Sequence, residues 1–78
     1  MNHPESSLEP EFQPEFPADQ LAAPARRALA GAGYTSLEAL AEVSEGDIVQ
    51  LHGIGPHALR TLRNALEEHG MSFAGESD

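Results

Sequence analysis

The chain has 78 residues, a formal net charge of -9 and no cysteine. This length is enough for one small domain but not for two. The lack of cysteine excludes disulfides, thiolate metal sites and cysteine nucleophiles, and it fits a reducing compartment. All four basic residues are arginine. The absence of lysine excludes a phosphate-binding P-loop and Schiff-base chemistry.

The first residues lack the basic and apolar regions of a signal peptide, and no apolar run approaches the roughly 20 residues of a membrane span. We therefore expect a cytoplasmic protein without membrane contact. The sequence offers no nucleophile beside a base and no pair of converging carboxylates, and so short a chain leaves little room for a substrate pocket. It predicts a protein that is not an enzyme and that uses no cofactor and no small-molecule substrate.

The negative charge is spread unevenly along the chain. Residues 1–20 hold five acids and no base, and residues 21–70 hold six acids and the four arginines. The last eight residues add two acids, so that the three parts carry -5, -2 and -2. The part with helical patterning is therefore nearly neutral, and most of the acidity lies outside it.

Residues 1–20 contain four prolines among glutamates, a composition that predicts a disordered acidic tail because it offers too little apolar burial to offset the entropy of ordering. Residues 74–78 are predicted to be disordered as well. A short tandem repeat in the tail, Glu-Pro-Glu-Phe followed by Gln-Pro-Glu-Phe, ends at Phe12 and Phe16. Two interpretations stay open for it: a solvated linker, which we favour, and a motif that binds a partner.

Helical patterning begins after residue 20. The first helix is expected to begin near Ala23, because Pro24 is tolerated only in a first turn. It is expected to end at the glycines Gly31 and Gly33, since glycine commonly follows the last turn of a helix.

Two short helices are predicted next. Thr35 and Glu38 have the spacing of a capping box, in which the threonine side chain accepts from the amide three residues on and the glutamate reaches back. This signal opens a helix that runs to about Ala41. Ser44 repeats the start signal with acids in the following turn, and it opens a second helix from which Ile48 and Leu51 face inward.

The last helix is expected to start at Pro56, whose fixed φ suits a first helical position, and to end before Gly70. Its apolar stripe consists of Ala58, Leu59, Leu62, Ala65 and Leu66. Met71 and Phe73 are expected to fold back and close the core. Together these elements predict an all-α fold over residues 21–73, a compact SAM-like bundle of four to five short helices.

A motif lies between the last two predicted helices. Residues 53–55 read Gly-Ile-Gly, and the surrounding apolar positions are Ile48, Leu51, Leu59 and Leu62. This spacing is typical of a helix-hairpin-helix, in which both glycines take positive φ and Ile54 packs between the helices. The turn presents a helix N-terminus whose unpaired amides can hold a phosphate oxygen without any lysine. Such contacts bind nucleic-acid backbone and read little sequence.

Residues 21–73 resemble the C-terminal domain of the bacterial RNA polymerase alpha subunit. The matching parts are Leu21, residues 25–29, Tyr34, residues 38–40, residues 44–45, the hairpin at 53–55, residues 59–66 and residues 70–72. The two patterns align without a gap over about two thirds of the chain. The resemblance implies a helix-hairpin-helix domain that binds the minor groove of promoter DNA and contacts transcription regulators.

The resemblance also places the DNA-contacting positions, which lie at the starts of the first and last helices. Pro24 stands where the family has its principal minor-groove arginine, and Arg27 stands at a contacting asparagine. Gly55 matches the hairpin glycine. His57 replaces a lysine, and Ala58 replaces a serine.

The expected nucleic-acid-binding residues are Arg26, Arg27, Gly53, Gly55, His57, Ala58 and Arg60. Arg26 is included because it lies beside the position of the family's arginine. Arg63 is left out because it is expected to pair with Glu67 four residues on. No metal site is expected, since His52 and His57 flank the hairpin without a cysteine or a converging carboxylate.

Two functions are compatible with these residues. In the first, the module binds DNA or RNA backbone weakly and without sequence preference, in a process related to transcription. In the second, the helical surface and the acidic tail bind a protein, such as a component of the transcription machinery, and nucleic acid is not bound.

Overall fold

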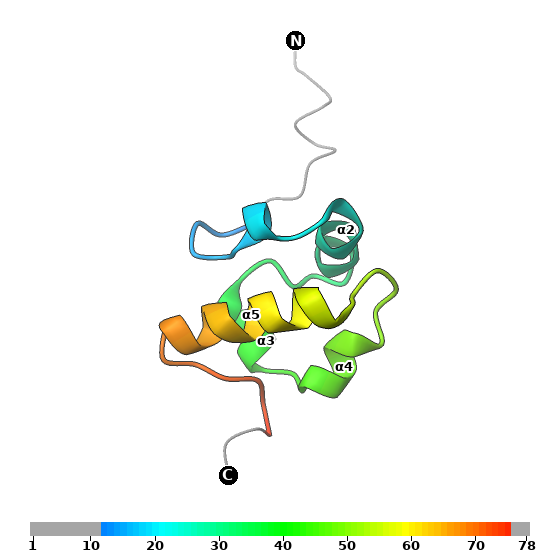
Figure 1. Ribbon diagram of the computed structural model, residues 1–78. Coiled ribbons are helices and arrows are strands. Elements are labelled where there is room, and N and C mark those ends of the chain that lie inside the picture. Colours follow the sequence, from blue (N-terminus) through cyan, green and yellow to red (C-terminus); the bar gives the residue numbers. More distant parts are fainter. Residues whose placement is uncertain (1–11, 76–78) are drawn as a thin grey trace.

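The computed structural model describes residues 12–75 (Figure 1). In chain order the elements are a 3-10 turn η1 (Ala18–Gln20) and the helices α2 (Ala23–Gly31), α3 (Leu37–Ala41), α4 (Glu45–Val49) and α5 (Pro56–Glu68). The described range contains no strand. The expected all-helical fold is therefore confirmed, with four α-helices.

The longest helix, α5, crosses the molecule and organises the other elements. Figure 1 shows η1 and α2 above α5, α3 behind it and α4 below it. Both α3 and α4 pack against α5. No helix in the described range is long and apolar enough to cross a membrane.

A single core of apolar side chains fills the space between these helices. The buried members are Phe16, Leu21, Ala25, Leu29, Leu37, Leu40, Ile48, Ala58, Leu62, Ala65, Leu66 and Phe73. The predicted stripe on α5 is confirmed except at Leu59, which is only partly buried. Burying an aliphatic side chain contributes about 1.5–3 kcal/mol. These contacts rather than helix propensity therefore stabilise helices as short as α3 and α4.

Serine side chains cap the two shortest helices. The Ser44 hydroxyl accepts a hydrogen bond from the Asp47 amide (3.2 Å), as expected. At α3 the expectation was wrong by one residue, because Ser36 and not Thr35 is the N-cap and accepts from the Ala39 amide (3.1 Å). Glu38 then falls at the second helical position, too early to form a capping box. The observed start lets α3 bury both of its leucines.

The end of α5 follows the predicted pattern. Gly70 has φ +72, and the Met71 amide donates to the carbonyl of Leu66 (2.7 Å) while the Gly70 amide donates to that of Glu67 (3.0 Å). These two bonds define a Schellman motif, which turns the chain back toward the helices. Phe73 is 1% exposed, which confirms that it closes the core.

The folded region starts earlier than predicted. Residues 12–17, which we call the N-terminal strap, pack on the helices, with Phe16 only 4% exposed. Phe12 stacks on Phe16 with a ring-centroid distance of 4.8 Å, and the Gln13 amide donates to the carbonyl of Thr35 (2.9 Å). The prediction of disorder is wrong for residues 12–20, because one buried aromatic side chain is enough to anchor a segment of unfavourable average composition.

At the other end of the chain, the Ala74 amide donates to the carbonyl of Val43 (2.9 Å), so the folded region also extends slightly past residue 73. The remaining parts of the two segments predicted to be disordered, residues 1–11 and 76–78, lie outside the described residues.

Candidate nucleic-acid interface

The turn between α4 and α5 uses its two glycines differently. Gly53 has φ +101, a conformation that favours glycine. Gly55 has φ -119 and ψ -174, which is extended backbone that any residue adopts. The expectation of positive φ is therefore wrong for Gly55, which serves instead as the N-cap of α5. Ile54 packs against the core beside the turn and is partly buried.

Gly53 lies directly against the first turn of α2. A Cβ atom at this position would be 2.7 Å from the carbonyl oxygen of Pro24 and 3.1 Å from its carbonyl carbon. Both atoms belong to the backbone, so they cannot move aside as a flexible side chain would. Only glycine permits this approach, which places the start of α2 beside the turn that leads into α5. Nothing in the sequence spacing pointed to this contact with Pro24.

The corner formed by the first turn of α2 and the turn before α5 lies beside two helix starts, and neither has a side-chain cap within the described range. The N-cap of α2 is Ala22 and that of α5 is Gly55, and each helix has a proline in its first two positions. By contrast, α3 and α4 begin with capping serines. The amides of an uncapped first turn need water or a ligand as a partner, and they carry positive dipole charge. The corner therefore presents amide groups suited to an anion.

The arginines expected at the site have different surroundings. Arg27 and Arg60 are exposed. Arg26 is half-buried, and its Nη1 donates to the carbonyl of Leu21. Arg63 forms an ion pair with Glu45 of α4 rather than with Glu67, which corrects the expectation for that pair. A pair within one exposed helix contributes only about 0.2–0.5 kcal/mol, so a carboxylate on a neighbouring helix competes easily.

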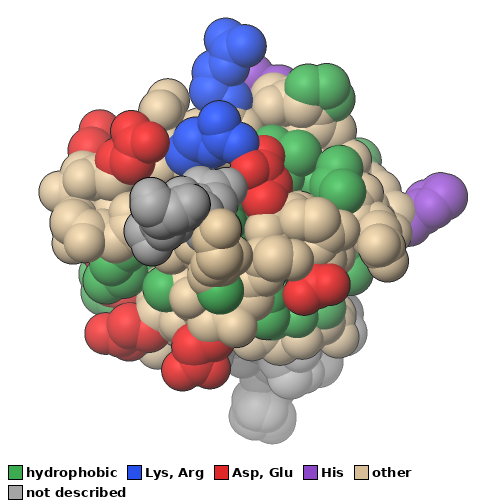
Figure 2. Space-filling view, turned by 90° about the horizontal axis from the view of Figure 1, so that it is seen from below, with side chains coloured by type: hydrophobic (Ala, Val, Ile, Leu, Met, Phe, Trp, Pro, Cys, Tyr) green, Lys and Arg blue, Asp and Glu red, His purple; other side chains and the backbone are tan. Residues whose placement is uncertain are grey.

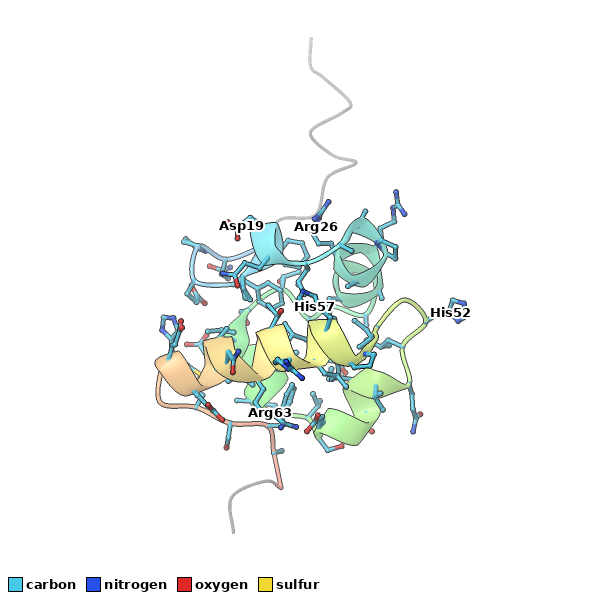
Figure 3. All side chains as sticks on the ribbon, in the orientation of Figure 1. Asp19, Arg26, His52, His57 and Arg63 are labelled. Atoms are coloured by element: carbon cyan, nitrogen blue, oxygen red, sulfur yellow. The ribbon has the colours of Figure 1, made fainter. Side chains whose placement is uncertain are left out.

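The two expected site residues that remain are His57 and Ala58, and His52 flanks the same turn without having been expected at the site. His52 and His57 are exposed, and Figure 3 shows His52 at the turn, directed away from the body of the molecule, and His57 on the first turn of α5. Ala58 is 6% exposed and belongs to the core. Its side chain cannot contact a ligand, so Ala58 can take part in a site only through its backbone amide.

The surface as a whole is acidic. Residues 12–75 contain eight carboxylates and four arginines, which gives a net charge of -4. The carboxylates are those of Glu15, Asp19, Glu38, Glu42, Glu45, Asp47, Glu67 and Glu68. Figure 2 shows one face, on which the arginine side chains in view gather at one edge while carboxylates are spread more widely. The described part of the molecule is therefore negative overall.

No group of three or more histidine, aspartate or glutamate side chains in the described range is placed to hold a metal ion. Comparison of the chain with protein-family models, with curated proteins and with solved structures gives no match. The resemblance to the polymerase alpha subunit therefore stays a prediction from the residues quoted above.

Proposed function

We propose that α4, the turn at residues 50–55 and α5 form a helix-hairpin-helix within a SAM-like domain, and that this module binds nucleic-acid backbone, most readily that of DNA. The left-handed Gly53, the partly buried Ile54 and the helix start at Pro56 support the hairpin assignment. The similarity to the polymerase alpha subunit domain supports a role related to transcription.

The observation that carries this proposal is the contact of Gly53, in the turn before α5, with Pro24 in the first turn of α2, together with the lack of a side-chain cap at either helix start. Each start offers unpaired amides, and phosphate oxygens are acceptors of the charge and size that such amides bind. Arg27 on α2 and Arg60 on α5 are exposed and add positive charge near the two starts.

This arrangement predicts weak binding without sequence preference. Affinity for nucleic acid rises with the number of phosphates that cations neutralise, and few cations are available here. With two or three phosphate contacts, the logarithm of the affinity should fall with the logarithm of the salt concentration with a slope of about -2 to -3. Because amide and arginine contacts to phosphate do not read base edges, duplexes of different sequence should bind alike.

A titration of fluorescent duplex DNA with the full chain at low salt tests the proposal. Arg27→Gln should weaken binding about three- to tenfold and reduce the salt slope by about 1, because it removes one exposed phosphate ligand. Arg63→Gln removes the same charge, but from a guanidinium already paired with Glu45, and should change the affinity less than about twofold. Equal losses in the two variants, or no binding by the wild-type chain, would contradict the proposal.

The net charge favours a second candidate function, that of a protein-binding adaptor. The described residues carry twice as many carboxylates as arginines, and two of the arginines already have partners in the fold. Such a surface repels polyanions at long range. If wild-type protein fails to bind duplex or single-stranded DNA at low salt, the adaptor is the better account.

A further inference from the structure

A groove lies between the N-terminal strap and α5. It has a volume of about 180 Å³, and its walls are Pro14, Glu15, Phe16, Pro17, Asp19, Gln20, Asn64, Ala65 and Glu68. This volume is below the roughly 300–1,000 Å³ of small-molecule sites, so it fits a single long side chain better than a substrate. The groove exists only because the strap is folded, since the strap and η1 form one whole wall.

Three carboxylates line the groove. Glu15 comes from the strap, Asp19 from η1 and Glu68 from the last turn of α5. None of the three forms an ion pair within residues 12–75. Figure 3 shows Asp19 and Arg63 on opposite sides of α5, so that arginine does not offset the charge of this wall. The C-terminal end of α5 adds the negative end of its helix dipole.

The floor and sides of the groove are partly apolar. Four apolar residues line the groove among the carboxylates, namely Pro14, Phe16, Pro17 and Ala65. Gln20 and Asn64 line it as well. This mixture suits a side chain with an apolar stem and a cationic end. Arginine fits best, because its planar guanidinium bonds carboxylates and amide oxygens at once and packs on flat apolar groups.

We propose that this groove binds an arginine side chain of a partner protein, presented on a basic segment. Charge complementarity selects the occupant: unpaired carboxylates face the groove, and the chain as a whole is negative. Asn64 and Glu68 lie in the C-terminal half of α5, whereas the proposed phosphate-binding corner is at its start. Along the helix axis the two sites are about 10–16 Å apart. The groove site does not depend on nucleic-acid binding.

The test uses isotopically labelled full-length protein and an acetylated hexapeptide of alternating arginine and serine, with a glutamine-for-arginine peptide as the neutral probe. At low salt the arginine peptide should shift the amide signals of Gln20, Asn64 and Ala65, and the neutral peptide should not. The double variant Asp19→Asn with Glu68→Gln should weaken binding about fivefold.

A matched variant controls for overall charge. Glu38→Gln with Glu42→Gln also removes two exposed carboxylates, but from α3 and its C-cap, outside the groove. It should weaken binding less than about twofold. The proposal is overturned if both double variants lose affinity equally, if the shifted amides lie elsewhere on the protein, or if the arginine and neutral peptides behave alike.

Discussion

Gly53→Ala should lower the free energy of unfolding by about 2–4 kcal/mol. Two effects contribute to this loss. A non-glycine residue at φ +101 is strained, and the added Cβ atom would lie 2.7 Å from the backbone oxygen of Pro24. Relief of that overlap requires the turn to move away from α2. Urea denaturation followed by far-ultraviolet circular dichroism measures the effect, which is large for a domain whose stability is only roughly 5 kcal/mol.

Gly55→Ala is the matched control for this prediction. Gly55 already has extended backbone angles, and no atom lies within 4 Å of the position its Cβ atom would take. Its substitution by alanine should change the free energy of unfolding by less than about 1 kcal/mol. If the two alanine variants lose similar stability, the close packing of the turn on Pro24 is not the feature that fixes this corner.

Phe16→Ala should cost about 3–5 kcal/mol and leave the protein largely unfolded at moderate temperature. Phe16 is a buried member of the core, although composition alone places it in a disordered tail. Removal of the ring leaves a cavity and releases the strap. Thermal unfolding should shift by about 4–8 °C for each kcal/mol lost.

Phe12→Ala provides the comparison for the strap. Phe12 is only partly buried and contributes mainly its stack on Phe16, so its loss should cost about 1 kcal/mol. A Phe16→Ala protein with nearly wild-type stability would show that the strap is not part of the folded core.

Local signals predicted the fold well wherever they act within a few residues. Pro24 and Pro56 mark helix starts, Ser44 caps α4, and Gly70 follows the end of α5. Each of these residues acts through its own backbone angles or through a hydrogen bond to a residue close in sequence. The capping box at Thr35 failed because Thr35 and Ser36 are both acceptable caps. Only the packing of the following leucines distinguishes them.

Long-range contacts could not be predicted from the sequence. The strap was missed because average composition does not reveal that one phenylalanine fits the core. At the candidate site, sequence spacing identified Gly53 and Gly55 but not their different conformations, which depend on the approach of Pro24. The pair between Arg63 and Glu45 links residues 18 positions apart, a separation that no helical periodicity specifies.

Under the two proposals, the two ends of α5 have opposite charge preferences. We propose an anion site at its N-terminal end, beside the start of α2, and a cation site among the carboxylates that line its C-terminal half. The helix dipole favours the same arrangement.

Gly55→Asp isolates the role of the uncapped amides. Aspartate is a favourable N-cap, so its carboxylate should accept from the first-turn amides of α5 and keep or raise stability by a few tenths of a kcal/mol. The same carboxylate occupies the proposed phosphate position. The variant should therefore stay folded and lose its affinity for DNA.

Heteronuclear NMR of the labelled wild-type chain and of Gly55→Asp, each titrated with the same short DNA duplex, tests the proposed anion site most directly. For the wild type we predict that the amide signals of Gly55, His57 and Ala58 shift together with those at the start of α2, and that the variant shows none of these shifts. Equal shifts in the two proteins, or wild-type shifts that lie away from both helix starts, would contradict it.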